Sequence, residues 1–247
     1  TLDALDAETE GMIGYLLQQA LRNAARGLEV ATLLTQVVVD RVDPGFARPT
    51  KPIGAVYPDR AAAEAAGHGE WSIAEDGRGF RRVVPSPDPK RVVEIGVIRH
   101  LVDAGVVVIA VGGGGIPVVE EADGSLHGVE AVIDKDLATA LLATGLGAQR
   151  MLLLTDVDAV HDDFRGPNDR AVRCGSPAAL RALSLPSGSM GPKVEAACRF
   201  AECGGEAVIG SLDELPALLA GRSGTMVSQR FEQLEWWTSA SPSGTGS

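Results

Sequence analysis

One stretch in the middle of the chain determines the fold class: residues 106–119 read VVVIAVGGGGIPVV. The first six residues, 106–111, form an unbroken apolar run, which is typical of a strand that is buried on both faces of a sheet. Four glycines follow at residues 112–115. Because glycine accepts positive φ and lets a ligand approach the backbone, these residues either present N–H groups to an anion or simply form a tight turn.

Helix and strand patterns alternate on both sides of this stretch. Helices are expected at residues 7–26, 60–66, 92–104, 134–144, 176–183, 193–203 and 212–220. Strands are expected at residues 30–39, 106–111, 151–155, 207–209 and 225–227, with a hairpin over 118–129 around the turn Asp123-Gly124. This alternation predicts an α/β protein with a mostly parallel sheet that helices cover on both faces.

The segment near residues 44–87 has a different character from the rest of the chain. It is rich in Pro and Gly and carries a single short helical pattern, so it is predicted to be a loop-rich inserted subdomain. The predicted division is a core of residues 1–43 and 88–227, a protruding lid-like subdomain at 44–87, and a flexible tail at 228–247.

Composition excludes several classes of function. The formal net charge is −11, and so acidic a chain is a poor candidate for nucleic-acid binding, which needs clustered cations. Three cysteines without a CxxC pair and four scattered histidines predict no metal site in the chain. No apolar run is long enough to span a bilayer, so no membrane partner is expected, and the few cysteines fit a reducing cytoplasm.

Two lysines lie at expected helix starts. Lys135 stands between Asp134 and Asp136, and Lys193 follows Pro192, a residue favoured at the first position of a helix. A helix start offers free N–H groups and partial positive charge, which suit a phosphate. Ordinary capping explains either site alone, but two such sites fit phosphoryl transfer, which depends on cations and N–H donors around the moving group.

Two further segments carry candidate ligand contacts. Residues 155–158, Thr-Asp-Val-Asp, place three polar side chains at the carboxyl end of the strand expected at 151–155, where ligands of parallel sheets bind, although capping of the next turn explains them as well. Lys51 lies between Pro49 and Pro52 on a stiff segment. It either reaches over a cleft or is an exposed loop lysine.

Taken together and in chain order, these segments resemble the carbamate kinases of the amino acid kinase family. The resemblance covers about residues 1–227 and rests on EGMIGY at 10–15, PTKPIG at 49–54, RRVVPSP at 81–87, GGGGIPV at 112–118, GVEAVIDKD at 128–136, TDVD at 155–158 and GSMGPKVEAA at 188–197. It implies a three-layer α/β/α sandwich with a small protruding subdomain, and a homodimer.

The resemblance also implies a reaction and a set of site residues. Members of this family transfer a phosphoryl group reversibly between ATP and carbamate with Mg²⁺, giving carbamoyl phosphate and ADP, mostly in the ATP-forming direction during arginine catabolism. The implied catalytic residues are Lys135, Asp136, Lys193 and Lys51. The implied nucleotide-binding residues are Thr155, Asp156, Val157, Asp158, His161, Met190 and Pro192, and the implied substrate-binding residues are Gly113 and Gly114.

The sequence departs from the family pattern in its N-terminal part. Two family turns, Gly-Gly-Asn-Ala and His-Gly-Asn-Gly-Pro-Gln, do not occur, and the N-terminal strands that carry them are absent from this sequence. The chain by itself is therefore expected to lack measurable activity. Two alternatives stay open, namely a non-catalytic nucleotide-binding or subunit-interaction homologue and another acyl-phosphate-forming kinase, although the segments at 49–54 and 81–87 favour carbamate kinase.

Overall fold

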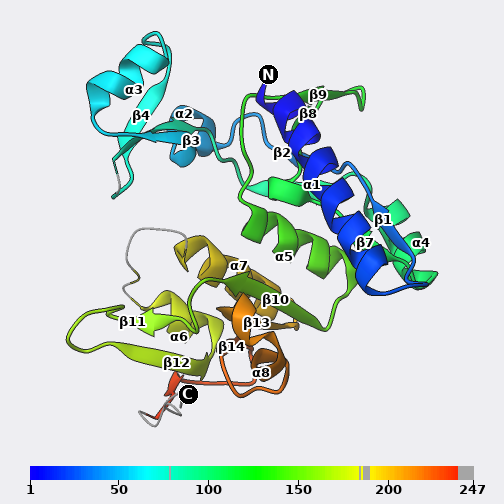
Figure 1. Ribbon diagram of the computed structural model, residues 1–247, viewed down its shortest axis with the longest axis vertical. Helices are drawn as coiled ribbons and strands as arrows, with labels where there is room; N and C mark the ends of the chain where they lie inside the picture. Colours follow the sequence, from blue (N-terminus) through cyan, green and yellow to red (C-terminus); the bar gives the residue numbers. More distant parts are fainter. Residues whose placement is uncertain (78, 184, 186–189, 239–247) are drawn as a thin grey trace. The chain divides into compact units, whose positions relative to one another are not determined.

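A computed structural model describes residues 1–77, 79–183, 185 and 190–238. The chain forms two compact units, Thr1–Leu141 and Leu142–Ser247 (Figure 1). The elements of unit 1 are α1 (Leu2–Ala24), β1 (Val30–Thr32), β2 (Gln36–Val39), α2 (Pro44–Ala47), β3 (Lys51–Tyr57), α3 (Arg60–Ala66), β4 (Ser72–Glu75), β5 (Phe80–Val84), β6 (Pro89–Val92), α4 (Ile95–Asp103), β7 (Val107–Ile109), the 3₁₀ turn η1 (Gly112–Gly114), β8 (Ile116–Glu120) and β9 (Leu126–Gly128).

Helix α5 (Lys135–Leu146) begins in unit 1 and ends in unit 2. The remaining elements of unit 2 are β10 (Arg150–Thr155), β11 (His161–Asp162), β12 (Arg170–Gly175), α6 (Pro177–Arg181), α7 (Met190–Glu202), β13 (Glu206–Ser211), η2 (Leu212–Glu214), α8 (Leu215–Leu219), β14 (Thr225–Val227) and β15 (Glu235–Trp236).

The sheets of unit 1 are mixed rather than mostly parallel. Strands β1 and β7 form a parallel pair, and a second sheet has the order β6-β2-β8-β9, in which only β2 and β8 run parallel. The hairpin of β8 and β9 turns at the predicted Asp123-Gly124. The short connection between β8 and β9 makes that pair antiparallel, as the predicted hairpin requires, whereas the antiparallel neighbour β6 was not predicted.

The single strand predicted at residues 30–39 is two strands, β1 and β2, that belong to different sheets. Between them lies Thr35, which is fully buried. Its hydroxyl donates to the Leu33 carbonyl at 2.9 Å and accepts from the Val111 amide at 3.1 Å. These bonds redirect the chain after β1 and join it to the glycine turn.

The first helix packs with an unusual face inward. Gly14 lies so close to β1 that a Cβ there would be 2.2 Å from Cγ2 of Thr32. Glu10, one turn earlier, is buried as well, whereas apolar side chains further round the helix are exposed. The exposed set is Leu5, Met12, Ile13, Tyr15, Leu16, Leu17 and Leu21. The helix therefore turns small and acidic residues toward its own unit and apolar residues away from it.

The inserted segment carries a sheet of its own, although the sequence predicted a loop-rich subdomain. Strands β3, β5 and β4 pair antiparallel in that order, and α3 packs against them. Arg82 lies over the ring of Trp71 at 5.2 Å. Pro52 lies near the start of the edge strand β3, and Pro58 and Pro85 directly follow β3 and β5, which is why a proline-rich composition is compatible with a small sheet here.

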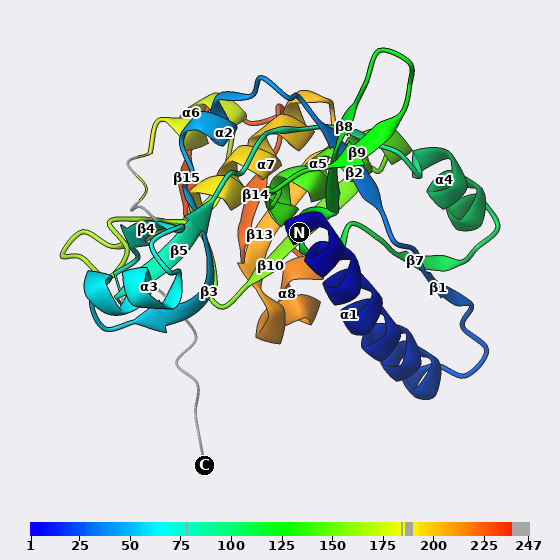
Figure 2. The same ribbon diagram turned by 90° about the horizontal axis from the view of Figure 1, so that it is seen from above.

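Unit 2 has one mixed sheet with helices on both sides. The strand order is β10-β13-β14-β12-β11, with β10 and β13 parallel and β13 and β14 antiparallel. Helices α7 and α8 lie on opposite sides of β13 (Figures 1 and 2), and the four middle residues of that strand are buried. This arrangement gives unit 2 the three layers that the sequence predicted.

The tail after residue 227 was predicted to be flexible, but its described part contains a strand. Strand β15 pairs antiparallel with β12, and the indole N–H of Trp237 donates to the Gly224 carbonyl at 3.0 Å. Arg170 lies over the Trp236 ring at 4.0 Å. Two aromatic side chains thus fix the end of the described chain to unit 2.

Several element boundaries also differ from the predictions. Helix α1 begins five residues early, at Leu2, and the helix predicted at 92–104 begins at Ile95 because Pro89–Val92 pairs with β2 as strand β6. The strand predicted at 106–111 is shorter, and it is not fully buried, because Val107 is 40% exposed. Within the described residues, no helix combines the length and the apolar character that a membrane span requires.

Candidate functional site

The glycine turn of unit 1 has a backbone that only glycine adopts easily. Val111 has a φ of 49°, and Gly113, Gly114 and Gly115 have φ values of 70°, 128° and 85°. A Cβ on Gly114 would lie 2.2 Å from the carbonyl oxygen of Ile133, two residues before the start of α5. The turn is therefore packed directly against the segment that leads into the predicted phosphate-binding lysine.

We expect replacement of Gly114 with Ala to lower the free energy of unfolding by about 2–3 kcal/mol, because the new Cβ adds a backbone clash to an unfavourable φ. Gly113 is the matched control, since its φ is also positive but no atom lies within 4 Å of its Cβ position. Gly113→Ala should cost only about 1 kcal/mol. Urea unfolding of both variants measures the difference, and equal losses would show that the contact with Ile133 does not constrain the turn.

The start of α5 is organised by Asp134. Its Oδ1 accepts from the amides of Asp136 at 2.9 Å and Leu137 at 3.4 Å, as the side chain of an N-cap residue does. Its Oδ2 accepts from Nζ of Lys51 at 2.5 Å. Burial alone would raise the pKa of Asp134, but the hydrogen bond and charge of Lys51, together with the two amides, outweigh burial and hold the pKa below its ordinary value. Lys51 thus reaches the start of α5 from the inserted sheet.

Lys135 and Asp136 also form an ion pair, but they differ in exposure. Nζ of Lys135 lies 3.5 Å from Oδ2 of Asp136. The Lys135 side chain is 57% exposed, whereas that of Asp136 is 8% exposed. The buried carboxylate can therefore orient a lysine whose ammonium group stays accessible to a ligand. The structure brings together three of the predicted catalytic residues of unit 1, namely Lys51, Lys135 and Asp136, around Asp134.

We expect Lys51→Ala to lower the free energy of unfolding by about 1–3 kcal/mol, because it leaves the Asp134 carboxylate, only 9% exposed, without its cation. The depressed pKa of Asp134 means that this stabilisation is present above the ordinary aspartate pKa and is lost as the pH falls through the lower folded value. The free energies of unfolding of the parent and of Lys51→Ala, plotted against pH, should therefore converge in acid.

A surface lysine provides the comparison for Lys51. Lys90 pairs with Asp88 at 3.0 Å, but their side chains are 49% and 31% exposed, so this pair is much less buried than that of Lys51 and Asp134. Lys90→Ala should change stability by less than about 1 kcal/mol. Chemical denaturation at several pH values tests both variants, and a Lys51→Ala loss no larger than that of Lys90→Ala would contradict the proposed importance of the buried pair.

In unit 2, the predicted nucleotide-binding residues 155–158 begin with Thr155, the last residue of β10. The Thr155 hydroxyl donates to Oδ1 of Asp156 at 3.1 Å, and Val157 is partly buried beside them. His161 begins β11, and each of its ring nitrogens contacts a carboxylate: Asp169 at 2.6 Å and Asp158 at 2.9 Å. The imidazole therefore ties the end of β10 to the loop before β12.

The charge of His161 depends on these two contacts. Burial alone would lower the pKa of His161, but the hydrogen bonds to Asp158 and Asp169 and their charges outweigh it and raise the pKa. Asp169 in turn accepts from the Arg165 amide at 2.8 Å. A protonated imidazole donates to both carboxylates, whereas a neutral imidazole donates to only one.

We therefore expect the loop at residues 161–169 to open more readily as the pH rises. A raised histidine pKa contributes stability that is fully present below the ordinary value and is lost as the pH rises through the folded value. The amide protection factor of Arg165, which is corrected for intrinsic exchange, should fall across this range. His161→Gln should give low protection at every pH. A pH-independent protection factor in the parent protein would contradict the bridging role of the imidazole.

The last predicted segment lies at the start of α7. The helix begins at Met190, so Pro192 is its third residue and not its first, and Lys193 lies within the first turn. Proline is tolerated there because the amides of a first turn have no partner inside the helix. Lys193 is only 4% exposed, and α7 packs against β10 and β13. The preceding Gly188 and Ser189 of the motif lie outside the described residues.

In unit 1, the sequence did not predict two residues that lie beside the glycine turn. Glu10 and Thr35 are buried beside the glycine turn, and the Thr35 amide donates to Oε2 of Glu10 at 2.8 Å. The spacing of Asp6, Glu10 and Gly14, four residues apart, places them on one helix face and was available in the sequence. The contact with Thr35 was not, because it depends on the way β1 ends.

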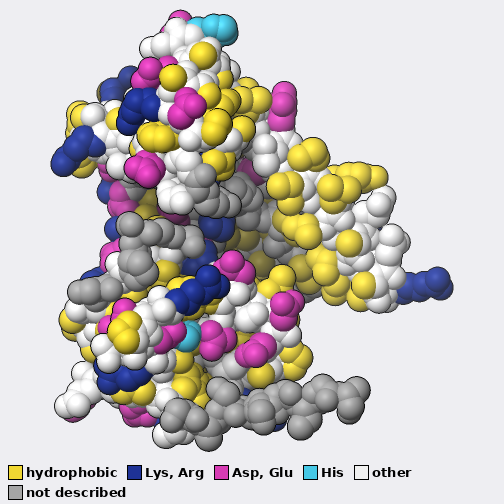
Figure 3. Space-filling view, turned by 60° about the vertical axis from the view of Figure 1, so that its left-hand side comes forward, with side chains coloured by type: hydrophobic (Ala, Val, Ile, Leu, Met, Phe, Trp, Pro, Cys, Tyr) yellow, Lys and Arg dark blue, Asp and Glu magenta, His cyan; other side chains and the backbone are white. Residues whose placement is uncertain are grey.

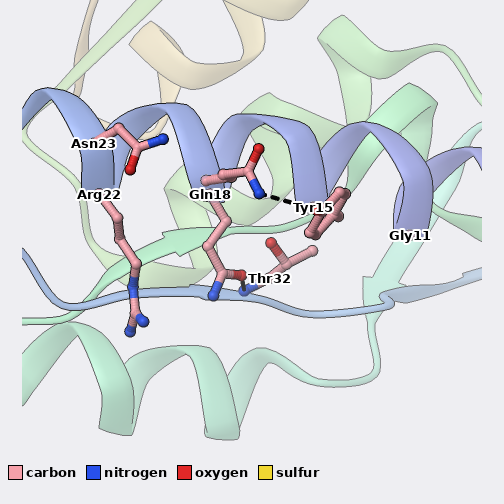
Figure 4. A pocket seen from close by; sticks show the side chains of 7 residues that line it. Gly11, Tyr15, Gln18, Arg22, Asn23 and Thr32 are labelled. Atoms are coloured by element: carbon pink, nitrogen blue, oxygen red, sulfur yellow. Dashed lines mark hydrogen bonds between the residues drawn. The ribbon is translucent and has the colours of Figure 1, made fainter.

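A cavity of about 370 Å³ lies elsewhere in unit 1, between α1 and β1. Figure 4 shows its lining, in which Gln18 of the helix accepts a hydrogen bond from the Thr32 amide at 3.1 Å and Gln19 donates to the Tyr15 hydroxyl. The lining residues are Gly11, Tyr15, Gln18, Gln19, Arg22, Asn23 and Thr32. None of them belongs to the predicted site. In the described part of the chain, no group of three or more acidic, His or Cys side chains is placed to hold a metal ion.

Comparisons with known proteins agree closely with one another. The model of the amino acid kinase family matches residues 6–211. A carbamate kinase of Haemophilus influenzae is 49% identical over 238 residues, which are 96% of this chain and 77% of that protein, and one of Rhizobium meliloti is 47% identical over 239 residues, 95% and 74% of the two chains. The solved structure of a carbamate kinase from Giardia lamblia bound to AMP-PNP has a TM-score of 0.80 at 39% identity and covers 92% of this chain and 75% of its own.

Proposed function

Because this chain belongs to the amino acid kinase family and matches carbamate kinases over nearly all of its length, we propose that it catalyses phosphoryl transfer between carbamoyl phosphate and ADP. In the ATP-forming direction, an oxygen of the ADP β-phosphate attacks the phosphorus of carbamoyl phosphate. The new oxygen–phosphorus bond forms as the bond to the carbamate oxygen breaks, and carbamate leaves. The observation that carries the proposal is the identity of nearly half of all residues, extending over more than nine-tenths of the chain.

The ion pairs of unit 1 support roles for its lysines. The transferred phosphoryl group spreads negative charge over its oxygens, so that cations already fixed in place stabilise the transition state. Lys135 would supply such a cation at the helix start, oriented by Asp136, and Lys51 would approach from the inserted sheet and exchange its contact with Asp134 for one with substrate. Gly113 and Gly114 would present their backbone to the carbamoyl phosphate.

The residues of unit 2 support nucleotide binding. Lys193 in the first turn of α7 would contact the phosphates in transit, and Met190 and Pro192 beside it would line the nucleotide pocket. Thr155, Asp156, Val157, Asp158 and His161 would form the rest of that pocket. Mg²⁺ would enter as part of the nucleotide substrate. Magnesium usually keeps several waters and binds through substrate phosphates and one or two carboxylates, so it needs no protein cage.

We propose in addition that two copies of the chain form a homodimer in the cytoplasm and serve arginine catabolism. The exposed apolar side chains of α1 support the dimer, since monomeric proteins rarely leave so contiguous an apolar face in water. Figure 3 shows hydrophobic side chains gathered over part of unit 1. Sedimentation analysis of the parent and of a Leu16→Glu variant tests whether this face joins the copies.

The test of the reaction is an assay of ATP formation from ADP and carbamoyl phosphate. It is run on this chain and on a version extended at its N-terminus with the corresponding segment of a carbamate kinase relative, because the chain spans about three-quarters of the length of its relatives. ATP from carbamoyl phosphate but not from acetyl phosphate supports the proposal. ATP from another acyl phosphate alone would indicate a different acyl-phosphate kinase, and binding of ADP without any turnover would indicate a non-catalytic homologue.

A further inference from the structure

A buried acid lies directly under the glycine turn. Glu10 of α1 is 4% exposed, and its Oε2 accepts from the Thr35 amide at 2.8 Å. A Cβ on Gly112 would lie 3.3 Å from Cγ of Glu10, so this side chain is in contact with the first residue of the turn. Its other oxygen, Oε1, is buried without a hydrogen-bond partner of normal geometry among the described residues.

The same carboxyl group is connected to the turn by a second route. The Thr35 amide donates to Glu10, and the Thr35 hydroxyl accepts from the Val111 amide. The Thr35 carbonyl accepts from the Ile116 amide at 2.8 Å. Val111 and Ile116 are the residues on either side of the four glycines. Glu10 and Thr35 together therefore hold both ends of the turn.

The surroundings of Glu10 make its charge unfavourable. Burial raises the pKa of Glu10 to about 7, the amides of Thr35 and Gly112 lower it less, and the acidic groups of Glu94 and Asp6 raise it further. The other elements that pack on α1 here, namely β1, the glycine turn and β8 as far as Val119, contribute uncharged residues. An ionised carboxylate is the better acceptor for the amides, whereas a protonated carboxyl group removes the buried charge.

We propose that Glu10 is a positioning residue for the glycine turn, and that it couples the binding of an anionic substrate at the turn to the uptake of a proton. The ionised form accepts from the amides of Thr35 and Gly112, and the protonated form keeps an acceptor oxygen for the Thr35 amide, so the turn keeps the conformation described above in both forms. An anion bound at Gly113 and Gly114 repels this carboxylate and so favours its protonated form. By linkage, the anion then binds more weakly as the pH rises. The identity of the anion as carbamoyl phosphate rests on the proposed function, whereas the link between Glu10 and the turn does not.

The first experiment needs no ligand. Backbone amide shifts of Thr35 and residues 112–115 are followed by NMR from about pH 5 to about pH 9, together with the side-chain carboxyl carbon of Glu10. All should move with one midpoint near the pKa of about 7. Turn amides that do not titrate, or that titrate with a midpoint different from that of the Glu10 carboxyl carbon, would overturn the proposal. This measurement uses the parent protein and does not depend on the folding of any variant.

Two variants separate Glu10 from its neighbour. Glu10→Gln keeps the shape and an acceptor oxygen but cannot titrate, so the turn amides should become independent of pH. Asp6→Asn is the matched control. Burial, followed by the charge of Asp3, raises the pKa of Asp6 to about 6, and Asp6 lies on the same helix face one turn away. In Asp6→Asn, the amide shifts of the turn should still change with pH. Loss of the transition in Asp6→Asn, or its survival in Glu10→Gln, would assign the titration to another group.

The second experiment adds the ligand. Calorimetric titration of carbamoyl phosphate in two buffers of different ionisation enthalpy measures the proton uptake on binding. We expect uptake near pH 7 in the parent, none in Glu10→Gln, and an affinity that falls on the order of fivefold or more from about pH 6 to about pH 8. Binding without proton uptake in the parent would overturn the coupling. Absence of any binding would overturn the proposed function, and the ligand-free titration would still decide whether Glu10 positions the turn.

Discussion

Replacing Lys193 with Met is expected to lower the rate of ATP formation from carbamoyl phosphate and ADP by about 10²–10³, measured in the version of the chain that is extended at its N-terminus. The loss corresponds to removing one fixed electrostatic donor from a transition state that carries distributed negative charge. Lys193 is 4% exposed and lies in the first turn of α7, so its charge acts in a medium that screens it little. Methionine preserves most of the length of the side chain, so the packing of the buried stem is disturbed less than by alanine.

A control identifies the effect as one of charge. Lys90→Met alters an exposed lysine of β6 and should leave turnover within twofold of the parent. Both variants should unfold cooperatively, which circular dichroism can establish before the rates are compared. If the turnover of Lys193→Met is also within twofold of that of the parent, Lys193 has no catalytic role.

Replacing Lys135 with Ala should have a comparable effect, a loss of about 10²–10³ in turnover, for the same electrostatic reason. The surroundings of the two lysines differ, however, and this difference is testable. Lys135 is 57% exposed, and its ammonium lies 3.5 Å from the buried carboxylate of Asp136. Salt screens exposed charges and affects buried charges much less.

The rate ratio between parent and variant should therefore depend on ionic strength for Lys135 but not for Lys193. We expect the ratio for Lys135→Ala to shrink severalfold between about 0.05 M and about 0.5 M salt, while that for Lys193→Met stays nearly constant. Lys135→Arg keeps the positive charge and should therefore retain more activity than Lys135→Ala. Identical salt dependence for the two positions would show that the exposure in the structure does not describe the active protein.

The local patterns in the sequence were sufficient to predict many of the elements. Helix α3 and strand β14 begin and end where they were predicted, because each is a short run of one propensity class between clear turn residues. The family resemblance is confirmed by the match to residues 6–211 and by the carbamate kinase relatives. Motifs spread over most of a chain carry far more information than any one of them alone.

The features that the sequence did not predict depend on contacts between distant residues. Thr35 splits one predicted strand in two, and it does so through the Val111 amide, 76 residues further along. Lys51 is fixed by Asp134, 83 residues away. Strand β15 forms by antiparallel pairing with β12, which lies more than 60 residues earlier in the chain. Neither propensity nor periodicity encodes such partners, and the roles of the individual site residues stay predictions until the variants are measured.

The positions of the aromatic residues give the two units separate optical reporters. The chain has three tryptophans, and Trp71 lies beside Tyr57 and under Arg82 in the inserted sheet of unit 1. Trp236 and Trp237 anchor the end of the chain to β12 and to Gly224 in unit 2. Indole emission shifts to longer wavelength when such a side chain enters water. A variant that keeps only Trp71 would report on the inserted sheet, and one that lacks Trp71 would report on unit 2, so that the order in which the two melt can be followed by fluorescence without any attached dye.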